Sequence, residues 1–182
     1  MSIPSSGQIS LTQIRDELQV IGQFHLFDSD ARKLANVLTG QIELKDFYTR
    51  KAIFVTPGQV DVGWTGYVAH PETSGYVTKG AISSPSTIFG VQCVEISYID
   101  NGVGNRIVQI AFRFFGATPP SKTFFGGVIL NGVLQRTSDS TVSFTSSTSA
   151  DGTFRGIWGF PVTSNPLTAV GVKGLVPFYT TG

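Results

Sequence analysis

The sequence predicts a mainly β protein, an antiparallel β-sandwich of the jelly-roll or immunoglobulin-like kind preceded by a short helical segment. Charge is concentrated at the start, because the first 51 residues hold 12 of the 25 charged side chains. Glycine shows the opposite trend, with 18 of 21 beyond residue 51. From Ile53 onward, apolar residues recur at every second position between Gly, Asn, Asp and Pro, as half-buried strands require.

We therefore divide the chain of 182 residues into a helical segment at 1–51 and an antiparallel β domain at 52–182. A small barrel is the alternative to the sandwich. A helical unit of this size with neither a disulfide nor a metal buries little area. We expect it to need a companion body or another chain to cover its apolar side chains.

Three short helices are predicted in the first part. The first begins at a capping box formed by Ser10 and Gln13 and ends at Gly22. Its apolar face, spaced by three and four residues, consists of Leu11, Ile14, Leu18 and Ile21. The second runs from Ser29 or Asp30 to Gly40 and buries Ala31, Leu34, Ala35 and Leu38. The third is a single turn within Leu44 to Tyr48.

Two hairpins stand out in the β part. Asn131-Gly132 between apolar runs predicts a type I′ turn that pairs Leu130 with Val133. Asp100-Asn-Gly102 predicts another hairpin, between two alternating strands. In the strand before this turn, Val94, Ile96 and Tyr98 share one face, and Cys93, Glu95 and Ser97 share the other; in the strand after it, Val108, Ile110, Phe112 and Phe114 share a face. Further strands are expected within 59–68, 75–82, 141–145, 153–160 and 170–179.

The sequence offers little catalytic chemistry. A net charge of +1 argues against a general electrostatic interaction with nucleic acid or an anionic membrane. Cys93 is expected to be an inert core thiol, His25 a structural imidazole and His70 a loop residue. The β part offers six carboxylates: Asp61, Glu72, Glu95, Asp100, Asp139 and Asp151. Asp100 and Asp151 fit turns. We predict no enzyme, no metal and no cofactor; a small glycan-cleaving sandwich would need two facing carboxylates.

Aromatic residues are abundant, with 14 Phe, 5 Tyr and 2 Trp, and charge is sparse. Any single aromatic residue can simply fill the core, but the whole set favours a surface partly covered by other subunits. The predicted contact residues of the β domain are Leu130, Asn131, Gly132, Val133, Phe124 and Phe125. A closed homo-oligomer follows as the expected state.

The helical segment contains an internal repeat. Gly7-Gln-Ile-Ser-Leu-Thr-Gln-Ile14 and Gly40-Gln-Ile-Glu-Leu-Lys-Asp-Phe47 match at four of eight positions. With Tyr48, these elements resemble a leader of virion structural proteins of tailed bacteriophages, which carries Gly-x-Ile-Ser and then Gly-x-Ile-x-x-x-Asp-Phe-Tyr. That pattern usually continues with Gly, where this chain has Thr49. The likeness covers about a quarter of the chain; a fainter one involves 75–85, the Asn-Gly hairpin and 156–158.

The resemblance implies a non-enzymatic virion protein whose leader docks on another virion subunit. The implied docking residues are Gly7, Ile9, Leu11, Ile14, Gly40, Ile42, Leu44, Phe47 and Tyr48. It favours a tail-associated component such as a fibre, neck or adaptor protein, often a trimer, with a capsid decoration or cement protein as the alternative. A further alternative is a module that binds a host glycan or receptor, in which Trp64, Tyr67, Tyr76 or Trp158 would stack on sugar rings.

Overall fold

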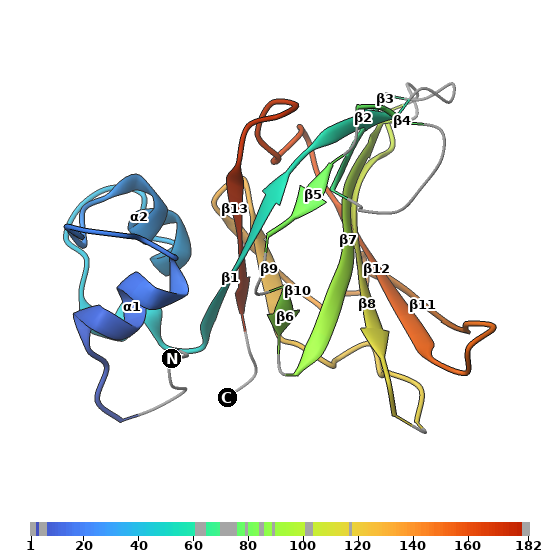
Figure 1. The fold of residues 1–182 in the computed structure, drawn as a ribbon, viewed down its shortest axis with the longest axis horizontal. Helices are drawn as coiled ribbons and strands as arrows, with labels where there is room; N and C mark the ends of the chain where they lie inside the picture. Colours follow the sequence, from blue (N-terminus) through green and yellow to red (C-terminus); the bar gives the residue numbers. More distant parts are fainter. Residues whose placement is uncertain are drawn as a thin grey trace.

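The computed structural model describes residues 3, 7–60, 65–69, 76–78, 80–83, 86–88, 90–100, 104–116 and 118–179. Over these residues the protein is mainly β: two antiparallel sheets pack together as a sandwich, and short helices lie in the N-terminal part (Figure 1). The predicted fold class is confirmed. The first strand begins at Arg50, beside the boundary placed at residue 51.

The first sheet has the strand order β10-β9-β13-β1-β5. Its strands are β1 (Arg50–Thr56), β5 (Ala81–Ile82), β9 (Gly127–Leu130), β10 (Val133–Arg136) and β13 (Gly174–Tyr179). The second sheet has the order β11-β12-β8-β7-β3-β2-β4, and β6 pairs with β7. Its strands are β2 (Gly58–Val60), β3 (Thr65–Ala69), β4 (Tyr76–Thr78), β6 (Thr87–Ile88), β7 (Val91–Asp100), β8 (Arg106–Phe114), β11 (Ser143–Thr148) and β12 (Phe154–Pro161).

Alternation along β8 places four side chains in the core between the sheets, as predicted: Val108, Ile110, Phe112 and Phe114. Strand β7 differs from the prediction. A bulge between Cys93 and Glu95 inserts one extra residue opposite β8, and this reverses the alternation. Cys93 therefore joins Ile96 and Tyr98 in the core. Burial raises the pKa of its thiol, in keeping with an inert packing role.

The Asn131-Gly132 hairpin has the predicted geometry. Leu130 pairs with Val133, and both turn residues have positive φ, 52° at Asn131 and 75° at Gly132, as a type I′ turn requires. Strands β7 and β8 also form a hairpin, with Asp100 opposite Arg106. The turn predicted there, at 101–103, lies outside the described residues.

The helical part consists of α1 (Leu11–Glu17), α2 (Ser29–Ala35) and the 3₁₀-helix η1 (Leu44–Phe47). The capping box of Ser10 and Gln13 is present, and η1 lies where the third helix was expected. Both α-helices end earlier than predicted. Asn36 takes a left-handed conformation after α2, and Gln19 does so after α1. Ile21, predicted to lie on the apolar face of the first helix, and Leu38, predicted to be buried, are therefore exposed.

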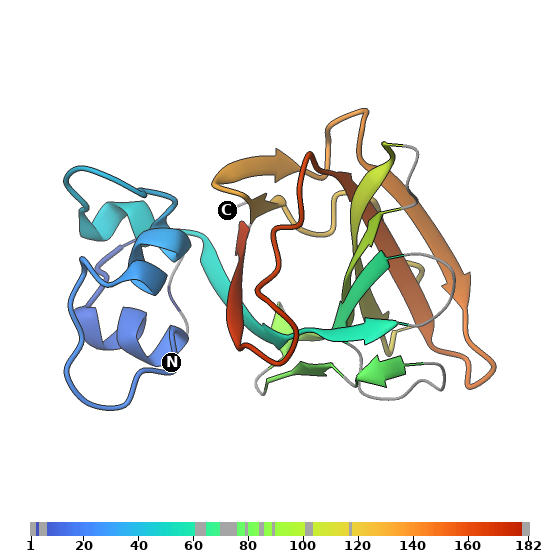
Figure 2. The same ribbon diagram turned by 90° about the horizontal axis from the view of Figure 1, so that it is seen from above.

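The helical part lies on the outer face of the first sheet, where α2 contacts β1 and β13 (Figures 1 and 2). Side chains from both regions form a second hydrophobic core, separate from the core between the sheets. Its buried members are Ile3, Ile9, Ile14, Leu18, Ala31, Leu34, Ala35, Ile42, Phe47, Ala52 and Phe54. The companion that covers the helical segment is thus the sheet of its own chain.

Candidate functional site

The internal repeat of the helical segment is also a structural repeat. Each copy opens with a glycine of positive φ, 89° at Gly7 and 83° at Gly40. The isoleucine two residues on is buried in both copies, at Ile9 and Ile42. A capping box follows in each, Ser10 with Gln13 and Glu43 with Asp46. Each copy then closes on a fully buried side chain, Ile14 or Phe47.

The exception to this burial is the leucine just after each cap. Leu11 is 50% exposed and Leu44 is 38% exposed. A turn explains the glycine of each copy, and burial in the core explains its isoleucine and its closing residue. Neither explains the exposed leucine. The hydroxyl of Tyr48 donates a hydrogen bond to the carbonyl of Gly7, so the two copies lie against each other.

The expected docking residues therefore divide into two groups. Ile9, Ile14, Ile42 and Phe47 lie inside the second core and are not available to another chain. This corrects their assignment as docking residues, and it arises because β1 and β13 supply the apolar surface that the segment lacks. Gly7 and Gly40 shape the backbone, and Tyr48 packs partly buried against the core. Leu11 and Leu44 remain exposed.

Thr49 follows Phe47-Tyr48 at the position where the resembling leaders have glycine. Its φ is 63°, a left-handed conformation that glycine adopts readily and a β-branched residue adopts at a cost. The exit turn from η1 into β1 thus keeps the conformation that a glycine would favour.

Glu17 anchors α1 to the sheet. Its Oε1 accepts a hydrogen bond of 2.9 Å from the backbone N–H of Ala52, and its Oε2 lies 3.4 Å from Nζ of Lys51. The side chains of this ion pair are only 10% and 15% exposed. The contact fixes the helical segment on β1 beside the second core.

The tip of the β9–β10 hairpin meets the helical segment. Leu38 packs so closely on Gly132 that a Cβ there would lie 2.9 Å from Leu38 Cδ1. A cavity of about 250 Å³ lies at this junction, lined by both regions, including Asn36, Leu38, Val55, Ile129 and Asn131. A second cavity, of about 290 Å³, is also lined by Asn131, together with Val133 and Pro161.

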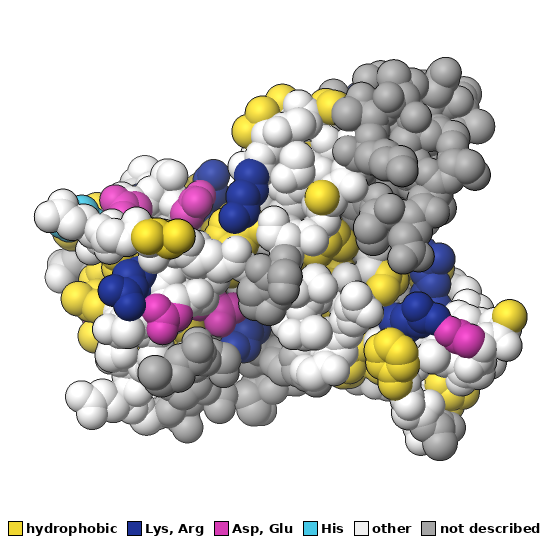
Figure 3. Space-filling model, viewed as in Figure 1, with side chains coloured by type: hydrophobic (Ala, Val, Ile, Leu, Met, Phe, Trp, Pro, Cys, Tyr) yellow, Lys and Arg dark blue, Asp and Glu magenta, His cyan; other side chains and the backbone are white. Residues whose placement is uncertain are grey.

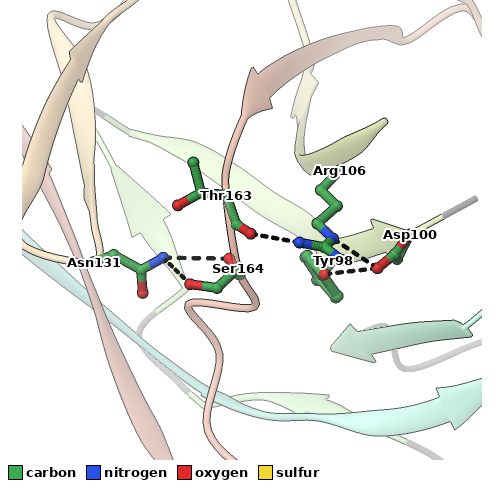
Figure 4. Close-up of polar contacts among 6 residues, drawn as sticks. All are labelled: Tyr98, Asp100, Arg106, Asn131, Thr163 and Ser164. Carbon is green, nitrogen blue, oxygen red and sulfur yellow. Dashed lines mark hydrogen bonds and ion pairs between the residues drawn. The ribbon is translucent and has the colours of Figure 1, made fainter. Parts of the chain in front are cut away.

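A polar network holds the tip to the rest of the sandwich (Figure 4). Asn131 Nδ2 donates to the carbonyl of Ser164 at 3.2 Å and to its Oγ at 3.0 Å. Arg106 donates to the Thr163 carbonyl at 2.7 Å and to Asp100 Oδ2 at 2.8 Å. The Tyr98 hydroxyl donates to the same Asp100 oxygen at 3.3 Å. Asp100 thus secures the ends of β7 and β8, a structural role.

Of the contact residues predicted for the β domain, Asn131 and Val133 are exposed, Gly132 is partly covered and Leu130 is buried. Phe125 is fully buried and Phe124 packs against the core. These two rings belong to an edge-to-face cluster with Phe112 and Trp158, so their assignment to the surface is wrong. Phe115, just after the end of β8, is instead an exposed ring, at 71%.

Other candidate residues have structural roles or lie outside the description. Trp158 is fully buried and donates to the Lys122 carbonyl at 2.7 Å, so it cannot stack on a sugar. Trp64 and His70 lie outside the described residues, as do the side chains of Tyr67 and Tyr76. His25, expected to be a structural imidazole, is exposed, because the chain around it forms a surface turn.

Three carboxylates of the sandwich, those of Glu95, Asp100 and Asp151, pair with cations of the same chain, whereas Asp139 accepts from the backbone N–H of Arg136. Glu95 accepts from Arg155, and also from Ser97 Oγ at 2.9 Å. Asp151 accepts from Thr153 and Arg113, and these contacts hold its pKa below the ordinary value, the Thr153 hydroxyl first among them. Asp61 and Glu72 lie outside the described residues.

The described residues contain neither a metal-binding group of side chains nor a membrane-spanning helix. No group of three His, Cys, Asp or Glu side chains among those residues could hold a metal ion. No described helix is long and apolar enough to span a membrane.

Comparisons of the chain with protein families, with curated proteins and with solved structures find no match.

Proposed function

We propose that the chain is a non-enzymatic virion structural protein of the tailed-bacteriophage kind, attached to a neighbouring virion subunit through its helical segment. The observation that carries this proposal is the repeated exposure of Leu11 and Leu44 in two copies of one structural element. The resemblance of that element to phage leaders supplies the class of partner. In this assignment the two leucines, and not the buried isoleucines, contact the partner.

The distribution of apolar surface supports docking by this segment. Among the described residues, the helical part holds five of the eight exposed large hydrophobic side chains: Leu11, Ile21, Phe27, Leu38 and Leu44. Figure 3 shows hydrophobic groups between charged ones over the helical part, at the left of the view. Burying one such side chain completely is worth about 1.5–3 kcal/mol. Several together supply the apolar centre that a protein interface needs.

The component is assigned by resemblance. A tail-associated fibre, neck or adaptor protein is our first choice, and a capsid decoration protein is the second. The sandwich would make contacts between copies in a homo-oligomer within the virion. A glycan- or receptor-binding role has less support, because Trp158, one of its four candidate aromatic residues, is buried.

The test compares full-length variants during particle assembly. Leu11→Glu combined with Leu44→Glu places two charges on the proposed docking surface without touching either core. Quantitative mass spectrometry of purified particles should show at least about a tenfold loss of incorporation, because an unpaired charge is costly to bury in an interface. Phe115→Glu, at a more exposed apolar position on the sandwich, is the matched control and should incorporate normally.

Circular dichroism should show that the double variant and the control are both folded. Normal incorporation of the folded double variant would refute docking through these leucines. Deleting residues 1–51 is a less clean test, because the deletion would uncover Phe54 and Leu175, which pack against the helical segment.

A further inference from the structure

Strand β11 forms an open edge of the second sheet. One side pairs with β12 from Ser143 to Thr148 in unbroken register, and no strand that the structure describes pairs with the other side. The strand Ser-Phe-Thr-Ser-Ser-Thr has six residues and contains no charge and no proline. Edge strands are usually protected against pairing with another chain by charged residues, by proline, by bulges or by being short. The other end strands fit that rule, because β4 and β5 are shorter and β10 carries Arg136.

The hydrogen bonds of the β11–β12 turn identify the backbone groups that face outward. The N–H of Ser149 donates to the carbonyl of Thr153 at 2.7 Å, so the backbone of Ser149 faces the β12 side. Residues that face the partner strand in this way alternate with residues that face away from it along an antiparallel ladder. Ser147, Thr145 and Ser143 therefore bond to β12. The N–H and C=O groups of Phe144, Ser146 and Thr148 point away from it.

We propose that this edge pairs with the β11 strand of a second copy of the chain, antiparallel about a two-fold axis at Ser146. This register places Ser146 opposite Ser146 of the partner subunit, and Phe144 opposite Thr148 of the partner subunit. All three outward-facing residues then lie in hydrogen-bonded pairs, each of which exchanges two backbone bonds. The second sheets of the two copies become one continuous sheet.

The side chains of β11 suit pairing with itself. The register brings hydroxyl-bearing residues together, such as Thr145 with Ser147 of the partner subunit, and cross-strand pairs of this type are favourable. Like charges are not brought face to face within the strand. Phe144 stays on its own core, with its ring 4.8 Å from that of Trp158, so pairing needs no rearrangement. A strand with fixed charges would instead select an oppositely charged partner.

One strand pair covers much less area than a stable dimer interface. The isolated protein should therefore dimerise weakly, and copies held side by side in an assembly should pair readily because their effective concentration is high. The pairing uses a different surface from the docking leucines and does not depend on the proposed function.

The test is sedimentation equilibrium of the full-length protein up to about 1 mM, the range in which weak association appears. Amide hydrogen exchange, followed by NMR, provides the local measurement. The amides of Phe144, Ser146 and Thr148 should gain protection as the protein concentration rises. The amide of Thr145, bonded within the chain, should be protected at every concentration.

Ser146→Pro removes one outward N–H and leaves the bonds to β12 intact, since proline is tolerated on the free side of an edge strand. It should raise the dimer dissociation constant at least about tenfold. Two further variants guard against misfolding. Ser146→Lys and Ser146→Glu should each fail to pair alone, because position 146 faces itself across the axis, and the two mixed together should pair.

Ser147→Lys is the matched control, because position 147 faces Thr145 of the partner subunit and not itself. It should dimerise alone. A protein that stays monomeric at about 1 mM would overturn the proposal. So would a dimer that persists in Ser146→Pro, or a mixture of Ser146→Lys with Ser146→Glu that pairs no better than either variant does alone.

Discussion

The two hydrophobic cores of the molecule are built in different ways. The core between the sheets is rich in aromatic rings, and Phe112 contacts Phe125, Trp158 and Phe178 at centroid distances of 5.5–5.9 Å. The second core consists mainly of aliphatic side chains from the helical segment, both from its helices and from the residues between them. It is completed by Ala52 and Phe54 on the outer face of β1. The sandwich core is thus internal to its region, whereas the helical segment borrows part of its core from the sheet.

This difference predicts unequal consequences of unfolding. Loss of the sandwich removes the surface on which the helical segment packs. Loss of the helical segment leaves the core between the sheets in place. The helical segment should therefore be able to open by itself, while the sandwich should not open without it.

Phe125→Ala should have the largest effect on stability. Its ring is fully buried, and its centroid lies 5.2 Å from that of Trp158. Truncation should lower the free energy of unfolding by about 3–5 kcal/mol and destabilise both regions. Urea denaturation followed by circular dichroism measures this. Phe115→Ala, at an exposed ring, should change the free energy of unfolding by less than about 0.5 kcal/mol. If Phe125→Ala and Phe115→Ala lower the free energy of unfolding equally, Phe125 is not a core residue.

Leu34→Ala tests the second core. Leu34 is fully buried in α2, and its truncation should cost about 2–5 kcal/mol locally. Hydrogen exchange should accelerate at residues 9–48, and the amides of β8 and β12 should keep their protection. A uniform loss of protection in both regions would show that the two cores unfold as one unit.

Sequence patterns predicted the parts of this architecture that depend on neighbours along the chain. The Ser10 cap, the Asn131-Gly132 turn and the alternation of β8 are local features, and the structure has all three. The patterns failed where distant contacts decide. The bulge that turns Cys93 inward is visible only in the pairing of β7 with β8.

The candidate site shows the same division. Sequence spacing identified both copies of the repeat but could not separate buried Ile9 from exposed Leu11, because both are apolar and only the outer face of β1 distinguishes them. The exposure of Leu38 was missed because Asn36 ends α2 early. Asn in a left-handed cap is a recognisable signal, and it could have shortened the predicted helix.

Glu17→Gln weakens the link between the two regions. Its carboxylate accepts from the Ala52 N–H and pairs with Lys51 in a little-exposed setting. Loss of this charge should cost about 1–3 kcal/mol in the stability of the helical segment, measured by hydrogen exchange. Lys45→Ala, which breaks the exposed Lys45–Glu43 pair, is the control and should have little effect. If the two variants behave alike, Glu17 does not anchor α1.

Thr49→Gly should stabilise the protein. The residue at this exit turn has a φ of 63°, which strains a β-branched side chain and suits glycine. Relief of the strain raises the free energy of unfolding, and the entropy that glycine loses on folding offsets part of this increase. The net gain should be about 1 kcal/mol, measured by thermal or urea unfolding. Thr49→Ala keeps the side-chain penalty and serves as the comparison. A loss of stability in Thr49→Gly would mean that the Thr49 side chain contributes more than its backbone costs.

Asp151→Asn should have the smallest effect, and one that depends on pH. Asp151 lies in the turn between β11 and β12, where hydrogen bonds from Thr153, then the nearby Arg113, lower the pKa of its carboxyl below the ordinary value of 3.8. A lowered pKa means that the folded state favours the ionised form. The carboxylate therefore adds stability above pH 3.8, and this contribution disappears as the pH falls through the lowered pKa.

Wild type should thus be slightly more stable than Asp151→Asn at neutral pH, and the difference should shrink in acid. Thermal unfolding from pH 7 down to about pH 2 measures it. Asp30→Asn, in an exposed pair on α2, provides a reference in the other region. A stability difference that is constant across the pH range would show that the ionisation of Asp151 does not stabilise the turn on which the β11 edge depends.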